Sequence, residues 1–113
     1  MKEIKAIIQP FVADKVISGL REMPELPGVT VSEVKGFGRQ RVLGPSNASE
    51  DVVIFGVKKI KLEIVVPNNL LQRVVDVIAK CAHTGNAGDG KIFILNVDDA
   101  VKIRTGKHME EAP

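Results

Sequence analysis

The chain contains four stretches in which apolar and polar side chains alternate, and two in which apolar side chains recur every three or four residues. Alternation is typical of a strand with one buried face, and the longer period is typical of an amphipathic helix. Pro10, Pro24 and Pro67 mark element ends, and Asn68 is the expected N-cap of the second helix. The pattern predicts strands over residues 1–9, 29–35, 59–66 and 91–97 and helices over residues 11–23 and 70–82.

Four of the six predicted elements have one apolar face that can contribute to a common core. In the first strand, Ile4, Ala6 and Ile8 share a face because successive side chains of a strand point to opposite sides. The corresponding stripes are Val12, Val16, Leu20 and Met23 in the first helix, Ile60, Leu62, Ile64 and Val66 in the third strand, and Leu71, Val74, Val75 and Ile78 in the second helix.

The order of elements is strand–helix–strand, a long connection, and strand–helix–strand again. Residues 6–10 resemble residues 63–67, which indicates a weak internal repeat of two βαβ halves. Two such halves predict an α+β, ferredoxin-like split βαβ fold (βαββαβ), with an antiparallel four-stranded sheet and two helices on one face. Charged outward side chains in residues 59–63 favour a partly hydrated, intersubunit surface on the other face.

The long connection covers residues 36–57. A connection of roughly twenty residues is uncommon in a compact domain and is usually functional or disordered. We therefore expect a mobile loop, in which residues 52–55 pair only transiently as a strand extension.

Composition narrows the class of protein. The chain has 113 residues, which predicts a single domain over residues 1–113, and its net charge of +2 gives no argument for nucleic acid or an anionic membrane. One cysteine, Cys81, excludes an internal disulfide and favours the cytoplasm, and no apolar run is long enough to cross a bilayer. With four Phe and no Tyr or Trp, the chain does not fit an RNA-binding ferredoxin-like domain, which stacks bases on aromatic side chains.

A glycine-rich segment, residues 83–92, carries the clearest chemistry. Gly85, Gly88 and Gly90 allow backbone N–H groups to turn inward around an anion, and Lys91 adds a positive charge. The spacing matches a P-loop, but Ile92 replaces the required Ser or Thr, and the segment follows a helix instead of opening one. Two interpretations remain open: a phosphate-binding loop, or a turn that ends the helix with Lys91 in solvent.

The tail adds two basic side chains, Lys102 and Arg104, which point to the same side if the segment is extended. They could bind a polyphosphate together with Lys91 only if the tail and the glycine-rich segment meet in space. Neither His83 nor His108 has an obvious carboxylate partner in the sequence. A Cys81–His83 pair is a poor metal site on a helix because residues two apart do not share a face. The sequence therefore predicts no enzyme and no metal centre.

These motifs together resemble the PII family of nitrogen-regulatory signal transduction proteins, over nearly the whole chain. The resemblance rests on KAIIQPF at residues 5–11, TVSEVKGFGRQ at 30–40, KLEIVVP at 61–67, TGNAGDGKIF at 84–93 and DDAVKIRTG at 98–106. It implies a homotrimer that binds ATP or ADP in the clefts between subunits. It also implies a T-loop at about residues 38–59, a B-loop at about 84–91 and a C-loop or tail at about 98–113.

The resemblance also implies site residues. Phosphate contacts fall on Gly88, Asp89, Gly90, Lys91, Lys102 and Arg104, the adenine and ribose region on Thr30, Gly36, Glu63 and Val65, and the base of the T-loop on Gly38, Arg39 and Gln40. Mg²⁺ accompanies ATP, and 2-oxoglutarate as a second effector would use Gln40 and Lys59. The T-loop would regulate a target protein or membrane transporter, such as an ammonium transporter or an enzyme of nitrogen metabolism, without membrane insertion or nucleic acid.

Three departures from the family pattern leave alternatives open. The chain has no tyrosine, and Val52 stands where many members carry the uridylylated tyrosine; Ser46 and Ser49 are the other modifiable positions of the T-loop. Gln9 replaces a basic residue near the expected 2-oxoglutarate carboxylates, and residues 42–57 are unusually apolar. The alternatives are a weak ATPase using the same cleft, an adenylate sensor for metal or inorganic-carbon transport, and a structural trimer whose glycine loop binds nothing.

Overall fold

The structure is a computed structural model that describes the backbone of residues 1–43 and 49–109. Side chains are described for residues 1–36 and 56–109. Its strands are β1 (Lys2–Ile8), β2 (Thr30–Leu43), β3 (Ser49–Val66) and β4 (Gly90–Asn96), and its α-helices are α1 (Ala13–Arg21) and α2 (Leu71–Ala82). Short 3₁₀ turns, η1 (Pro10–Val12) and η2 (Asn68–Leu70), lead into the two helices.

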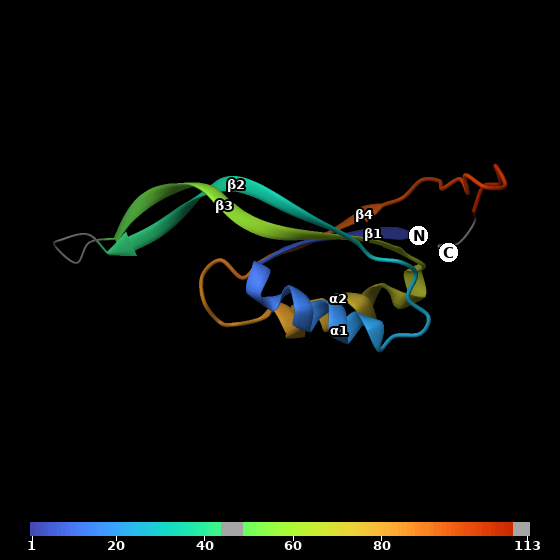
Figure 1. Cartoon of the computed structure of the whole chain (residues 1–113), viewed down its shortest axis with the longest axis horizontal. Helices are drawn as coiled ribbons and strands as arrows, with labels where there is room; N and C mark the ends of the chain where they lie inside the picture. The colour runs from blue at the N-terminus through green and yellow to red at the C-terminus, as the bar shows by residue number, and fades with distance from the viewer. Residues whose placement is uncertain (44–48, 110–113) are drawn as a thin grey trace.

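The four strands form one sheet in the order β2-β3-β1-β4, and every neighbouring pair is antiparallel. Both helices lie on one face of this sheet (Figure 1). The predicted ferredoxin-like fold is confirmed. None of the helices formed by residues 1–43 and 49–109 combines the length and apolar character needed to cross a membrane.

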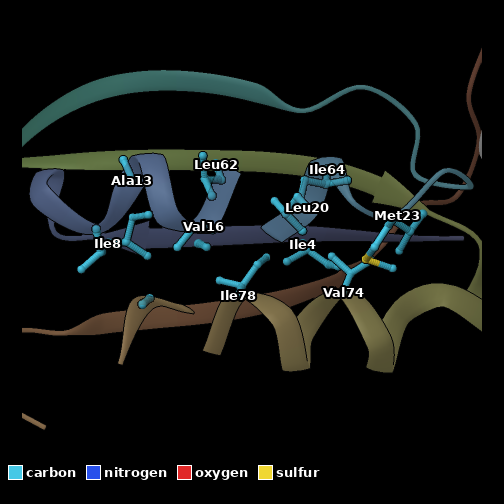
Figure 2. Packing of buried hydrophobic residues seen from close by; sticks show 14 of the residues in the cluster. Ile4, Ile8, Ala13, Val16, Leu20, Met23, Leu62, Ile64, Val74 and Ile78 are labelled. Atoms are coloured by element: carbon cyan, nitrogen blue, oxygen red, sulfur yellow. The ribbon is translucent and has the colours of Figure 1, made fainter. Parts of the chain in front are cut away.

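The core lies between the two helices and the inner face of the sheet (Figure 2). Ile4, Ala6 and Ile8 of β1 are almost fully buried, as alternation predicts. The stripe predicted in the first helix is also confirmed, since all four of its members are buried: Val12, Val16, Leu20 and Met23. Full burial of such a side chain stabilises the fold by about 1.5–3 kcal/mol.

The second helix is rotated relative to its predicted stripe. Val74 and Ile78 are fully buried, but Leu71 and Val75 are only half-buried, and Leu70 and Ala82 take the remaining core positions. The deepest residues thus recur every four positions from Leu70. The predicted N-cap was wrong: Asn68 lies inside η2, and no side chain caps either η2 or α2.

The prediction of a long loop over residues 36–57 was wrong for the described residues, which form a β-hairpin, whereas the expected mobility of this segment stays a prediction. Strands β2 and β3 stay paired from Thr30–Glu63 to Leu43–Ser49, and the hairpin extends well beyond the helices (Figure 1). The register shifts once, after Gly36, where Gly56 is the unpaired residue and has φ of 73°. A glycine adopts this bulge conformation without steric cost, so glycines that suggested a loop are compatible with continued pairing. Ser46 lies outside the described residues, as do the side chains of Ser49 and Val52.

Candidate functional site

The segment between α2 and β4, residues 83–89, is organised by the carboxylate of Asp89. Its Oδ2 accepts hydrogen bonds from the backbone N–H groups of Thr84 (2.8 Å) and Gly85 (3.0 Å), and its Oδ1 accepts one from Thr84 Oγ1. Asn86 N–H donates to Thr84 Oγ1 at 3.2 Å. These bonds, first of all the one from the Thr84 hydroxyl, hold the pKa of Asp89 below its ordinary value. The geometry is that of a residue that shapes the loop.

Glycines give this loop its path. Gly85, Gly88 and Gly90 have φ values of 85°, 90° and 103°, which other residues rarely adopt. At Gly90 a Cβ atom would lie 1.8 Å from the carbonyl oxygen of Ile7, so only glycine fits where the loop joins the sheet. Lys91 follows on β4, opposite Ile7, with its side chain exposed.

One atom ties the middle of the loop to the sheet. The Gly88 carbonyl oxygen accepts hydrogen bonds from Gln9 Nε2 at 2.7 Å and from Lys59 Nζ at 3.0 Å. Lys59 was predicted at a second-effector site. The hydrogen bond of Gln9 to Gly88 and those of Thr84 to Asp89 were missed. The spacing of Thr84, Asp89 and Gly90 is compatible with a turn held by side-chain hydrogen bonds, so the sequence did carry a signal for Thr84. It carries none that places Gln9 beside Gly88.

A second cluster brings together three predicted adenine and ribose residues. Thr30, Glu63 and Val65 line a cavity of about 310 Å³, together with Glu3, Pro27 and Gly28. Thr30 pairs with Glu63 across β2 and β3, so both side chains lie on the sheet face opposite the helices. Lys61 Nζ lies 3.4 Å from Glu63 Oε1 on that face.

Gly36, the fourth residue of this predicted set, does not line the cavity but pairs with Val57 farther along the hairpin. Gly38, Arg39 and Gln40 follow in β2, and their side chains lie outside the described residues.

The tail, residues 97–109, folds back on itself. Val101 forms a bridge with His108, and Lys102 N–H donates to the Lys107 carbonyl at 2.9 Å. Asp99 accepts a hydrogen bond from Ala100 N–H at 2.8 Å, and its Oδ2 lies 2.6 Å from His108 Nδ1. This contact lowers the pKa of Asp99.

The histidine interpretation needs correction, because both histidines have carboxylate neighbours. His108 contacts Asp99, and His83 Nδ1 lies 3.7 Å from Asp89 Oδ2. Sequence reasoning missed both pairs because each joins residues that a turn brings together. Among the described side chains, those of residues 1–36 and 56–109, no group of three or more His, Cys, Asp and Glu is placed to hold a metal ion.

The glycine loop and the basic tail do not meet within one chain. Strand β4 begins at Gly90, beside Ile8, and ends at Asn96, beside Lys2, so loop and tail leave opposite ends of the same strand. Seven residues of strand span about 20 Å. In Figure 1 the tail, in red, extends away from the loop, in orange. Lys102 and Arg104 therefore contribute to a phosphate site at Lys91 only when they come from another copy of the chain.

Both edge strands and the tail expose large apolar side chains. In edge strand β4, Phe93, Ile94 and Leu95 are between 40% and 52% exposed, and Val31 of edge strand β2 is 47% exposed. In the tail, Ile103 is 98% exposed and alternates with Lys102 and Arg104. Apolar side chains concentrated at strand edges are typical of a surface that another chain covers.

Comparison with known proteins places this geometry in a family. The family model of the nitrogen regulatory protein P-II matches residues 1–107. The chain is 44% identical over 107 residues to a nitrogen regulatory protein P-II of Bradyrhizobium diazoefficiens, an alignment that covers 95% of each chain. It is 43% identical over 112 residues to a nitrogen regulatory protein P-II 1 of Escherichia coli. It is 41% identical over 112 residues to a nitrogen regulatory protein P-II of Rhodospirillum rubrum. Both alignments cover 99% of each chain.

Proposed function

Since the chain belongs to the P-II family of nitrogen regulatory proteins, we propose that it is a non-catalytic signal-transduction protein that binds ATP or ADP and regulates a partner protein. The observation that carries the proposal is the preformed loop from Thr84 to Lys91. Its glycines are fixed in conformations that suit close approach of a phosphate, and its one carboxylate is already bonded within the loop. The N–H groups of Thr84, Gly85 and Asn86 are used inside the loop, so the N–H groups nearer Lys91, together with Lys91 itself, are the proposed partners of an anion.

The proposed base-binding region is the cavity lined by Thr30, Glu63 and Val65. Its volume of about 310 Å³ suits a planar base with part of a ribose. The Glu63 carboxylate offers acceptors to an exocyclic amino group or a ribose hydroxyl, and Val65 offers apolar contact. Gly36, Gly38, Arg39 and Gln40 would complete the site from the hairpin.

We place the complete site between subunits of a homotrimer. Two observations support this arrangement: loop and tail leave opposite ends of β4, and both edge strands expose apolar side chains. A neighbouring copy would bring Lys102 and Arg104 to phosphates held at Gly88–Lys91, while burying side chains such as Phe93 and Ile103.

The proposed output is the β2–β3 hairpin, which extends away from the sheet and helices (Figure 1). Mg-ATP and ADP would favour different hairpin conformations because only ATP has the γ-phosphate. 2-Oxoglutarate is the proposed second effector, at Gln40 and Lys59. The target would be a transporter or an enzyme of nitrogen metabolism in the cytoplasm, and the absence of tyrosine excludes control by tyrosine uridylylation.

Calorimetric titration with Mg-ATP and with Mg-ADP, each with and without 2-oxoglutarate, tests the proposal. We expect saturable binding of both nucleotides, weakened by Lys91→Ala and by Arg104→Ala, and 2-oxoglutarate binding only beside ATP. Lys80→Ala, at an exposed position on α2, is the matched control and should bind like the unmodified chain. Binding that neither Lys91→Ala nor Arg104→Ala alters would contradict the site. Phosphate release faster than in buffer would instead support an ATPase.

A further inference from the structure

The Gly88 carbonyl oxygen accepts hydrogen bonds from two side chains that belong to different parts of the sheet. Gln9 directly follows β1 and donates from Nε2 at 2.7 Å, whereas Lys59 lies within β3 and donates from Nζ at 3.0 Å. A backbone carbonyl has two lone pairs, so these two donors fill its acceptor capacity. The middle of the glycine loop is therefore held twice, through one atom.

The two donors differ in what they do when an anion arrives. The Lys59 ammonium carries a full charge on a flexible stem, so an anionic oxygen attracts it by a charge–charge interaction that the neutral Gly88 carbonyl does not provide. An anionic oxygen near the loop is thus a better partner for Lys59 than the neutral Gly88 carbonyl. The Gln9 amide is uncharged and gains no such advantage by leaving.

Gln9 is also well placed to remain. It precedes Pro10, which restricts its backbone to extended conformations, and its φ of −68° and ψ of 141° fall in that region. Its own carbonyl accepts a hydrogen bond from Val12 N–H at 3.3 Å, so the backbone is held between β1 and η1. The Gln9 side chain is half-buried and unbranched, and its Nε2 lies 2.7 Å from the Gly88 carbonyl oxygen.

We infer that Gln9 is a positioning residue of the nucleotide site: it keeps the Gly88 carbonyl bonded when Lys59 transfers its ammonium to an anionic oxygen of the bound ligand. The inference rests on the proposed function because it requires a ligand at the loop. Before binding, Gln9 and Lys59 share the carbonyl; after binding, Gln9 holds it alone. Gly88, Asp89 and Gly90 then keep the same path in both states, and Lys59 is free for the ligand.

A double-mutant cycle with isosteric apolar side chains tests this role. Gln9→Met should weaken Mg-ATP binding about 3- to 10-fold, the effect of one neutral hydrogen bond, because departure of Lys59 then leaves Gly88 without either donor. In the Lys59→Met background, Gln9 is the same donor before and after binding, so Gln9→Met should change affinity less than about twofold. Gln9→Lys, which keeps a donor, should bind at least as tightly as the unmodified chain.

Amide hydrogen exchange without ligand provides a second measurement. Either single substitution should leave exchange of the loop amides, residues 84–90, within about twofold of the unmodified chain, and the double substitution should raise it about tenfold. Adding 2-oxoglutarate identifies the partner of Lys59: coupling with Mg-ATP alone assigns a phosphate oxygen, and coupling only with both ligands assigns a carboxylate.

The outcomes separate this inference from the proposed function. Equal losses of affinity from Gln9→Met in both backgrounds, as a general structural role predicts, would overturn the inference and leave nucleotide binding intact. Full loss of exchange protection in Gln9→Met alone would overturn it as well, because the carbonyl would then not be shared. Failure of the unmodified chain to bind either nucleotide would remove the proposed function and the inference together.

Discussion

The glycine loop and the tail occupy opposite ends of β4, and each is closed by an aspartate, but they are built differently. Asp89 closes the loop with hydrogen bonds from a hydroxyl and two backbone N–H groups, and Gln9 and Lys59 fasten the loop to the sheet. Asp99 closes the tail with a contact to His108. Beyond Val97, whose N–H donates to the Met1 carbonyl, the tail's backbone bonds join tail residues to one another. The loop is thus preformed by the fold, whereas the tail is a self-closed segment that another copy can receive.

The largest expected difference concerns one glycine in each region. Gly90→Ala should lower the free energy of unfolding by about 3 kcal/mol or more, because the new Cβ would lie 1.8 Å from a backbone oxygen of β1. Gly106→Ala, in the tail, should cost about 1 kcal/mol, since its φ of 69° is strained for alanine but the surrounding space is open. Urea denaturation measures both. Equal effects would mean that the loop is not fixed by the sheet.

The next prediction separates the bonds that close each region. Asp89→Leu should accelerate amide exchange of Thr84 and Gly85 roughly tenfold, because both N–H groups donate to Asp89 Oδ2 and leucine offers no acceptor. Asp99→Leu should leave these amides unchanged and should raise exchange at Ala100, whose N–H donates to Asp99 Oδ1. Exchange monitored by NMR distinguishes the two sites. An Asp99→Leu effect on the loop would show that the two ends of β4 are coupled.

Acid titration offers a reciprocal test of the two carboxyl groups. Both pKa values lie below the ordinary value, so each carboxylate stabilises its region above a pH of about 3.9, and the contribution is lost as the pH falls through the lowered pKa. His108→Ala should return the pKa of Asp99 toward its ordinary value and leave that of Asp89 unchanged. Thr84→Val should do the reverse. Carboxyl chemical shifts report both groups, and a shift of both in either variant would contradict independent closure.

The smallest effect on stability should come from Lys91, beside the glycine loop, and Arg104, in the tail. Lys91→Ala and Arg104→Ala should each change the free energy of unfolding by less than about 0.5 kcal/mol, because both side chains are exposed. Their role would then be visible only in ligand affinity. A larger loss of stability in denaturant would mean that one of them supports the fold itself.

Periodicity in the sequence predicted the core because burial of one face is a local property of each element. Ile4, Leu62 and Val16 all lie where the pattern indicated. The hairpin was missed because Gly36 and Gly56 are as compatible with a loop as with a bulged pair of strands, and only pairing across the hairpin decides between them. The stripe of α2 was misplaced by part of a turn, because Leu70 and Ala82 take core positions that the predicted stripe gave to Leu71 and Val75.

The glycine loop was predicted from composition, but its internal bonds were not. Asp89 was expected to contact phosphate, yet its carboxylate is bonded to Thr84 and Gly85, which a spacing pattern does not reveal. The contact between Gln9 and Gly88 joins residues 79 positions apart, so it depends on the pairing of β1 with β4. Local sequence indicates what a segment can do, and tertiary pairing determines what it contacts.

The pairing of β1 with β4 also has a consequence for biosynthesis. Lys2 and Asn96 are 94 positions apart and yet lie side by side, so β1 is synthesised well before the strand that pairs with it at this edge. Contacts of such sequence separation form slowly. Until β4 emerges, β1 has a free edge next to an apolar core, and such an edge can pair with another nascent chain. Premature termination before residue 90 would make that exposure permanent and yield an aggregation-prone fragment.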